Sequence, residues 1–204
     1  MIFNTLQYLK LKLDAFLQSD ATGTSINSNE GALVLDNIAK IEDPGFQSNN
    51  RVIATLVNLE EESTLKNRIP KKTENGRVKY ERPPVNYNLY VLFCANFSDY
   101  NESLKALSKV SAFFQSKNYF SYTEDPPPTE DEISLSEEEK QEFKIYFDLY
   151  TMTFEQLNHL WGSLGGKQVP SLLYKVRLVP IKYDRLLSSG RVIERVNRES
   201  ALSQ

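Results

Sequence analysis

The segment from Val85 to Ala95 constrains the fold more than any other part of the chain. Apolar residues occupy every second position, which predicts a β-strand. Toward its C-terminal end the alternate positions become apolar too, with Tyr90, Leu92 and Cys94. Because both faces of such a strand have to be removed from water, we predict a central strand in a sheet that is covered on both sides.

The remaining periodic segments supply the partners of this strand. Helices are indicated by three- and four-residue apolar spacing near the N-terminus, by an N-cap at Asp99 and by a Thr153/Gln156 capping box followed by Gly165-Gly166. Strands are indicated by alternation or by β-branched runs. The expected order is a helix over 2–17, strands over 33–38, 51–59 and 85–95, a helix from 99 to 114, a strand over 143–150, a helix over 154–164 and a strand over 171–181. We therefore predict an α/β (α+β) fold with a single mixed sheet of four to six strands and helices packed on it.

Two polar segments are expected to lie outside this core. Residues 60–82 are rich in Lys and Arg and contain Asn75-Gly76, which favours a tight turn and hence an extended hairpin. Residues 124–142 are rich in Asp and Glu and contain three consecutive prolines from Pro126, so we predict a solvated acidic loop. A length of 204 residues suits one domain. We expect this domain to cover residues 1–182, and residues 183–204 to form a polar tail or arm.

The chain carries little that catalysis requires. His159 is the single histidine and Cys94 the single cysteine, and each falls within a periodic segment where a packing or surface role is the simpler interpretation. Gly165-Gly166 follows a predicted helix instead of preceding one, which does not fit a phosphate-binding loop. The carboxylates lie mainly in polar runs, where a rigid acid/base pair is not expected. We predict a protein that is not an enzyme and has no metal or other cofactor.

Charge leaves a binding role open. The net charge is only −3, which gives no general attraction to nucleic acid or to an anionic membrane. The basic run from Lys66 to Arg82 could follow a phosphate backbone, but it is interrupted by Glu74 and Glu81 and offers only Tyr80 for base stacking. A loop that contacts a protein partner is the preferred interpretation. A small nucleic-acid-binding protein stays an alternative, and a hydrolase or nuclease with an unrecognised acidic site is a weaker one.

Three blocks of sequence resemble a known family. They are LVNLEEE at 56–62, NLYVLFCANF at 88–97, and EQLNHLWGSLGGK at 155–167 continued by PSLLYKVR at 170–177. Their order and spacing are similar to those of the cap, or tail terminator, proteins of extracellular contractile injection systems of the Photorhabdus virulence cassette and antifeeding prophage type. The resemblance covers residues 1–182. It implies a tail-terminator-like domain without enzymatic activity.

The resemblance also implies partners. A six-membered ring of this chain would close the inner tube and contact the last ring of the sheath, alone or with cap paralogues, and neither a membrane nor nucleic acid is expected. The protein would be made in the bacterial cytoplasm and then become part of a released or cell-associated particle. A sheath-adaptor or baseplate component of the same particle is the alternative. The polar residues that the core does not need are the candidate interface: Lys66, Arg68, Lys71, Lys72, Arg77, Asn158, His159, Lys167, Arg177, Arg185, Arg191 and Arg195.

Overall fold

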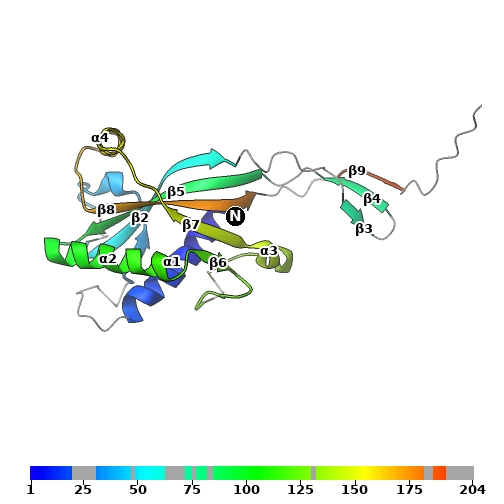
Figure 1. Ribbon diagram of the computed structural model, residues 1–204, viewed down its shortest axis with the longest axis horizontal. Coiled ribbons are helices and arrows are strands. Elements are labelled where there is room, and N and C mark those ends of the chain that lie inside the picture. Colours follow the sequence, from blue (N-terminus) through cyan, green and yellow to red (C-terminus); the bar gives the residue numbers. More distant parts are fainter. Residues whose placement is uncertain are drawn as a thin grey trace, which may run out of the picture.

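The predicted mixed sheet is present in the computed structural model, which describes residues 1–19, 31–46, 49–62, 72–74, 77–81, 85–129, 132–181 and 186–191. Six strands form the main sheet in the order β1-β2-β5-β8-β7-β6 (Figure 1). β1 runs parallel to β2, and the other neighbours are antiparallel. The strands are β1 (Leu33–Leu35), β2 (Arg51–Glu61), β5 (Val85–Asn96), β6 (Tyr119–Ser121), β7 (Lys144–Leu149) and β8 (Ser171–Ile181). The predicted fold class is confirmed.

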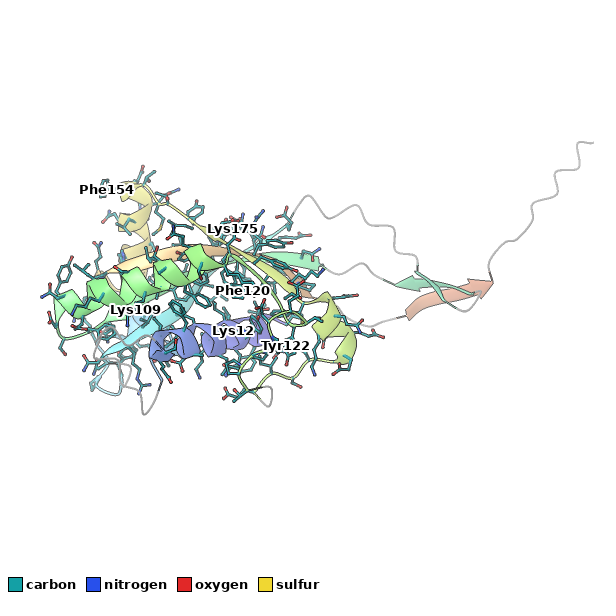
Figure 2. All side chains as sticks on the ribbon, turned by 60° about the horizontal axis from the view of Figure 1, so that its bottom comes forward. Lys12, Lys109, Phe120, Tyr122, Phe154 and Lys175 are labelled. Atoms are coloured by element: carbon teal, nitrogen blue, oxygen red, sulfur yellow. The ribbon has the colours of Figure 1, made fainter. Side chains whose placement is uncertain are left out.

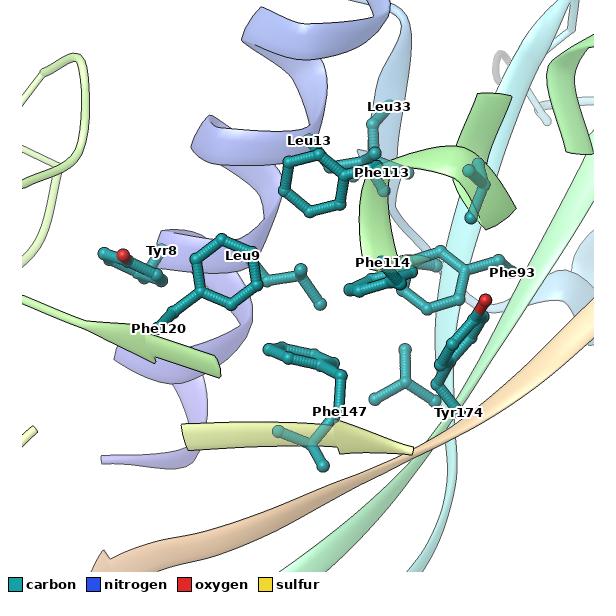
Figure 3. Packing of buried hydrophobic residues seen from close by; sticks show 14 of the residues in the cluster. Tyr8, Leu9, Leu13, Leu33, Phe93, Phe113, Phe114, Phe120, Phe147 and Tyr174 are labelled. Atoms are coloured by element: carbon teal, nitrogen blue, oxygen red, sulfur yellow. The ribbon is translucent and has the colours of Figure 1, made fainter. Parts of the chain in front are cut away.

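Two long helices cover one face of this sheet, which we call the inner face. They are α1 (Ile2–Ser19) and α2 (Tyr100–Ser116), and Figure 1 shows both beneath the sheet. Their buried side chains join Val91, Phe93 and other alternate residues of the strands in the larger hydrophobic core. Aromatic rings dominate its centre. Figure 3 shows Phe114 beside Phe93, and the centroids of these two rings are 5.5 Å apart. The ring of Tyr174 also lies beside that of Phe114, with 4.3 Å between their centroids. Burial of this apolar area is what holds the two helices on the sheet.

The opposite, outer face is covered only in part. A 3-10 helix, η1 (Ile38–Lys40), and the helix α4 (Phe154–Ser163) pack over Ile53, Leu92 and Cys94. Trp161 is the buried residue of α4 and is 4% exposed. The prediction that β5 is covered on both sides is therefore confirmed, since its alternate residues belong to two separate cores.

The ends of α4 follow the predicted pattern. The Thr153 hydroxyl accepts a hydrogen bond from the Gln156 amide at 3.2 Å, and the Gln156 side chain accepts one from the Thr153 amide at 3.0 Å. After the helix, Gly165 and Gly166 adopt positive φ angles of 103° and 84°, which non-glycine residues rarely tolerate. The Gly166 amide donates to the Trp161 carbonyl at 2.7 Å, which closes the helix end.

The prediction that residues 124–142 form a solvated acidic loop is wrong. A short helix, α3 (Glu137–Glu142), begins at Ser136 with a complete capping box, and Ile133 is 6% exposed. Side chains of α1 hold the segment: Asn4 donates to the Ser134 carbonyl at 2.7 Å, and Tyr8 donates to the Asp125 carbonyl at 2.7 Å. The acidic composition gave no indication that Ile133 is buried or that Ser136 caps a helix.

The sheet ends in short strands. β6 was not predicted, and β1 is shorter than the expected strand over 33–38 because the chain turns into η1. Three-residue edge strands show no alternation that a sequence pattern can reveal. Such short edges also offer little backbone for pairing with another chain.

A second, three-stranded sheet lies at the far end of the molecule from α2 (Figure 1). It contains β3 (Lys72–Glu74), β4 (Arg77–Glu81) and β9 (Leu186–Arg191), in the order β3-β4-β9. β3 and β4 pair with Glu74 opposite Arg77, the register of the hairpin predicted around positions 75 and 76, which themselves lie outside the described residues. β9 belongs to the predicted tail and pairs with β4. We call β3, β4 and β9 the arm.

Candidate functional site

Cys94 and His159 lie in different environments, one buried in β5 and the other exposed on α4. Cys94 is fully buried, and burial raises the pKa of its thiol to about 12, so it stays protonated. The ring of His159 lies on the exposed side of α4, 3.8 Å from the Glu155 carboxylate. No group of three or more His, Cys, Asp or Glu side chains is placed to hold a metal within the described ranges.

No helix within the described ranges combines the length and the apolar character required to cross a bilayer. Three regions on the surface of the body are candidates for contact with other molecules.

The first region lies on the outer sheet face at the margin of the core under α4, to which the buried Tyr90 belongs. Here Tyr90 of β5 donates a hydrogen bond to Glu60 of β2 at 2.7 Å. Lys175 of β8 lies 3.7 Å from the same carboxylate and 5.4 Å from the centre of the Tyr90 ring. Burial is the main cause that raises the pKa of the Tyr90 hydroxyl, and the hydrogen bond to Glu60 raises it further. Burial by itself lowers the pKa of Lys175, but the contacts with Tyr90 and the acidic side chains outweigh it, so the net shift is upward.

The same band continues across β8, β7 and β6. Arg177 forms an ion pair with Asp148 at 2.5 Å, and its guanidinium lies 5.8 Å from the centre of the Tyr146 ring. Tyr146 in turn packs against Tyr119 of the edge strand, with ring centroids 4.9 Å apart. The outer face thus presents a row of paired charges and tyrosines, and of these residue types tyrosine and arginine are enriched at protein interfaces. We call this row the tyrosine band.

The other two regions are apolar. Phe154 at the start of α4 is 91% exposed, and Figure 2 shows it at the upper edge of the body. On α2, Tyr100 is 65% and Leu104 43% exposed. Side chains of this size normally lie inside a protein or in an interface with another molecule.

Comparison with known proteins gives these surfaces a context. Residues 5–195 match the family described as the Pvc16 N-terminal domain. The chain belongs to this family. No curated protein sequence matches the chain. Two solved structures of similar fold are described as the sheath/tube terminator of an extracellular contractile injection system, PVC, in the extended state, and as the tube terminating cap of the anti-feeding prophage.

The likeness to these two structures is one of fold. The first is 18% identical with a TM-score of 0.58, and the match covers 100% of this chain and 66% of that chain. The second is 16% identical with a TM-score of 0.54, and the match covers 81% of this chain and 53% of that chain. This Pvc16 N-terminal domain chain thus spans about two thirds and about half the length of the two proteins it resembles. The predicted family resemblance is confirmed.

In this family member the predicted interface residues fall into two groups. Asn158, His159 and Lys167 are exposed on α4 and on the turn after it, and Arg177 lies in the tyrosine band. Lys72, Arg77 and Arg191 lie in the arm, where Arg77 and Arg191 occupy opposite positions of β4 and β9. Lys66, Arg68, Lys71, Arg185 and Arg195 lie outside the described residues. The seven described residues thus lie on α4 and the turn after it, on β8 and in the arm, and whether they bind a partner stays a prediction.

Sequence reasoning did not select the apolar members of the surface. Helical spacing predicts a buried stripe that includes both Phe154 and Trp161, but α4 begins at Phe154 and its side chain is 91% exposed. The same spacing predicts that Leu104 lies on the buried face of its helix, yet it is 43% exposed. A search for large apolar residues at the first turn of a helix would have found both Phe154 and Tyr100.

Proposed function

We propose that this chain is a structural cap that terminates the tube and sheath of a phage-tail-like contractile injection particle. The single observation that carries the proposal is the match of residues 5–195 to the Pvc16 N-terminal domain. The two terminator structures of the same fold support it, because their descriptions name a sheath/tube terminator and a tube terminating cap. On this proposal the chain has no catalytic role, is assembled in the bacterial cytoplasm and leaves the cell, if at all, as part of the particle.

Termination is a physical problem of unlimited growth. Tubes and sheaths grow by heterologous contacts, in which each added ring presents the surface that binds the next. A terminator has to match the last ring on one side and offer no such surface on the other. We propose that six copies of this chain form a ring that does so, with the tube, the sheath and possible cap paralogues as partners.

On this proposal the arm lets each subunit of the ring contact a partner that lies beyond its main sheet and helices. β4 leads into β5 and β8 leads into β9, so the arm extends from the two central strands of the main sheet. Val85 pairs with Ile181 in the body and Glu81 with Leu186 in the arm. We propose that the arm, including Lys72, Arg77 and Arg191, contacts the sheath or the neighbouring cap subunit.

Electron microscopy of particles from a strain that lacks this gene tests the proposal. We expect tubes and sheaths of variable, abnormal length, and restoration of uniform capped particles when the gene is supplied on a plasmid. A gold label on the chain should mark the end opposite the baseplate. Uniform capped particles without the gene, or a label at the baseplate, would refute the cap function.

A further inference from the structure

Each of the two strands that flank β5 contains an extra residue at nearly the same level of the main sheet. In β2, the residues before and after Val57 pair with consecutive residues of β5, so Val57 has no pairing partner there. In β8, Arg177 and Leu178 together occupy the interval that Asn88 occupies alone in β5. An extra residue of this kind is a β-bulge, which bends its strand and increases the local twist. We call these two sites the paired bulges.

The directions of the side chains agree with both bulges. Residues that are three apart in a regular strand point to opposite faces of the sheet. In β2, however, Val57 packs against the core on the outer face, and Glu60 bonds to Tyr90 on that same face. In β8, Val176 and Val179 both belong to the core on the inner face. Both strands therefore change their alternation at the bulges, whereas β5 between them does not.

The parts of the three strands beyond the bulges connect the main sheet to the arm (Figure 1). We call them the stem, which consists of residues 58–61 of β2, 85–88 of β5 and 179–181 of β8. Residues 82–84 lead from the arm into the stem, and residues 182–185 lead back from the stem to the arm. Because both connections are short, a turn of the stem is passed on to the arm.

Contacts on both faces hold the stem at one angle. On the outer face, Glu60 of the stem accepts a hydrogen bond from Tyr90 at 2.7 Å and lies 3.7 Å from Lys175. Tyr90 and Lys175 both lie on the other side of the bulges from Glu60. On the inner face, Val179 of the stem is fully buried in the larger core. The bend is therefore a fixed feature of the fold.

We propose that the paired bulges aim the arm, because they set the angle at which the stem leaves the main sheet. This inference rests on the proposed contact of the arm with the sheath or the neighbouring subunit, and it assigns the direction of that contact to two extra backbone residues. β-Bulges serve elsewhere to redirect a strand or a side chain toward a functional position. Here the two bulges act together, since they bend the strands on both sides of β5.

Deletion of Val57 or of Leu178 in the full chain tests the proposal. Either deletion removes one bulge and leaves every other pair of β5 with its neighbours unchanged. The matched controls are Val57→Ala and Leu178→Ala, which shorten the same side chain but keep the extra backbone residue. Spin labels on Ser108→Cys of α2 and Val85→Cys of the stem report the angle by pulsed electron paramagnetic resonance, because both positions are exposed while Cys94 is fully buried and stays unlabelled.

Two measurements decide the outcome. Each deletion should shift the mean distance between the labels by about 3 Å or more, the rise of one strand residue, and particles assembled with it should lack their caps. The alanine variants should keep both the distance and the caps. If a deletion prevents folding, which circular dichroism detects, insertion of one alanine after Val57 enlarges the bulge instead and should give the same two changes.

Two results would overturn the inference and leave the cap function standing. One is an unchanged distance in the folded deletion or insertion variants, and the other is normal capping despite a shifted distance. Failure of the cap function itself is recognised separately, by normal particles in the strain without the gene.

Discussion

Replacement of Phe114 by alanine tests whether the aromatic cluster under α2 is the main source of stability. The Phe114 side chain is 3% exposed, and its ring centre lies 4.3 Å from that of Tyr174 and 4.8 Å from that of Phe147. Removing a buried Phe side chain costs about 3–5 kcal/mol, and the loss of ring–ring contacts places this site at the upper end. We expect a decrease of about 4 kcal/mol in the free energy of unfolding.

Urea unfolding followed by Trp161 fluorescence measures this change. With a slope of about 2–3 kcal/mol per molar urea, the midpoint should fall by roughly 1.3–2 M. Phe154→Ala is the matched control, because it makes the same chemical change at a side chain that is 91% exposed, and it should alter monomer stability by less than about 0.5 kcal/mol. A Phe114→Ala cost below about 1 kcal/mol, or equal costs for the two variants, would refute the assignment of this core.

Three further outcomes follow from single sites and from the arm. Native protein at pH 8 should not react with a thiol reagent at Cys94, because this residue is fully buried, whereas unfolded protein should react within seconds. Ellman's assay with and without urea measures the two rates. Rapid reaction of the folded protein would contradict the packing of β5. Thr153→Ala should lower the free energy of unfolding by about 1 kcal/mol, whereas Thr153→Ser should restore most of it, and equal stabilities would show that the cap of α4 contributes nothing. Deletion of residues 185–204 removes β9 but none of the main sheet. The circular dichroism spectrum and the urea midpoint should therefore stay close to those of the full chain, while particles lose their caps. Aggregation of the shortened chain would show instead that the tail belongs to the core.

The central part of the fold could be predicted because its signals are repeated along the chain. Alternation predicted β5 and β8, and the bounds of β8 agree with the expected strand over 171–181. Double-faced apolar character at Tyr90 to Cys94 predicted coverage on both sides, which the two cores confirm. The caps of α2 and α4 were also recognisable, because Asp99 and Thr153 precede apolar helical spacing and each accepts an amide hydrogen bond in the structure.

Other parts were not predictable from composition alone. The composition of residues 124–142 predicts a solvated loop, but in the structure Ile133 is buried and the Ser136/Glu139 capping box is complete. The tyrosine band combines residues of five strands, so Glu60, Tyr90 and Lys175 become neighbours only when the order of strands is known. Exposure of Phe154 depends on where α4 begins relative to the sheet, which spacing within the helix does not reveal.

The arm changes how the polar hairpin and the polar tail are understood. Taken from the sequence, residues 60–82 and 183–204 are two separate extensions. In the structure β4 of the first pairs with β9 of the second, so both belong to one sheet that continues from the central strands β5 and β8. Both of these strands carry residues of the two cores, so the arm extends from strands that are well buried in the body. A protein that has to hold a ring and reach a neighbouring layer gains from this arrangement, since the arm is anchored by the same strands that carry α2 and α4 on their two faces.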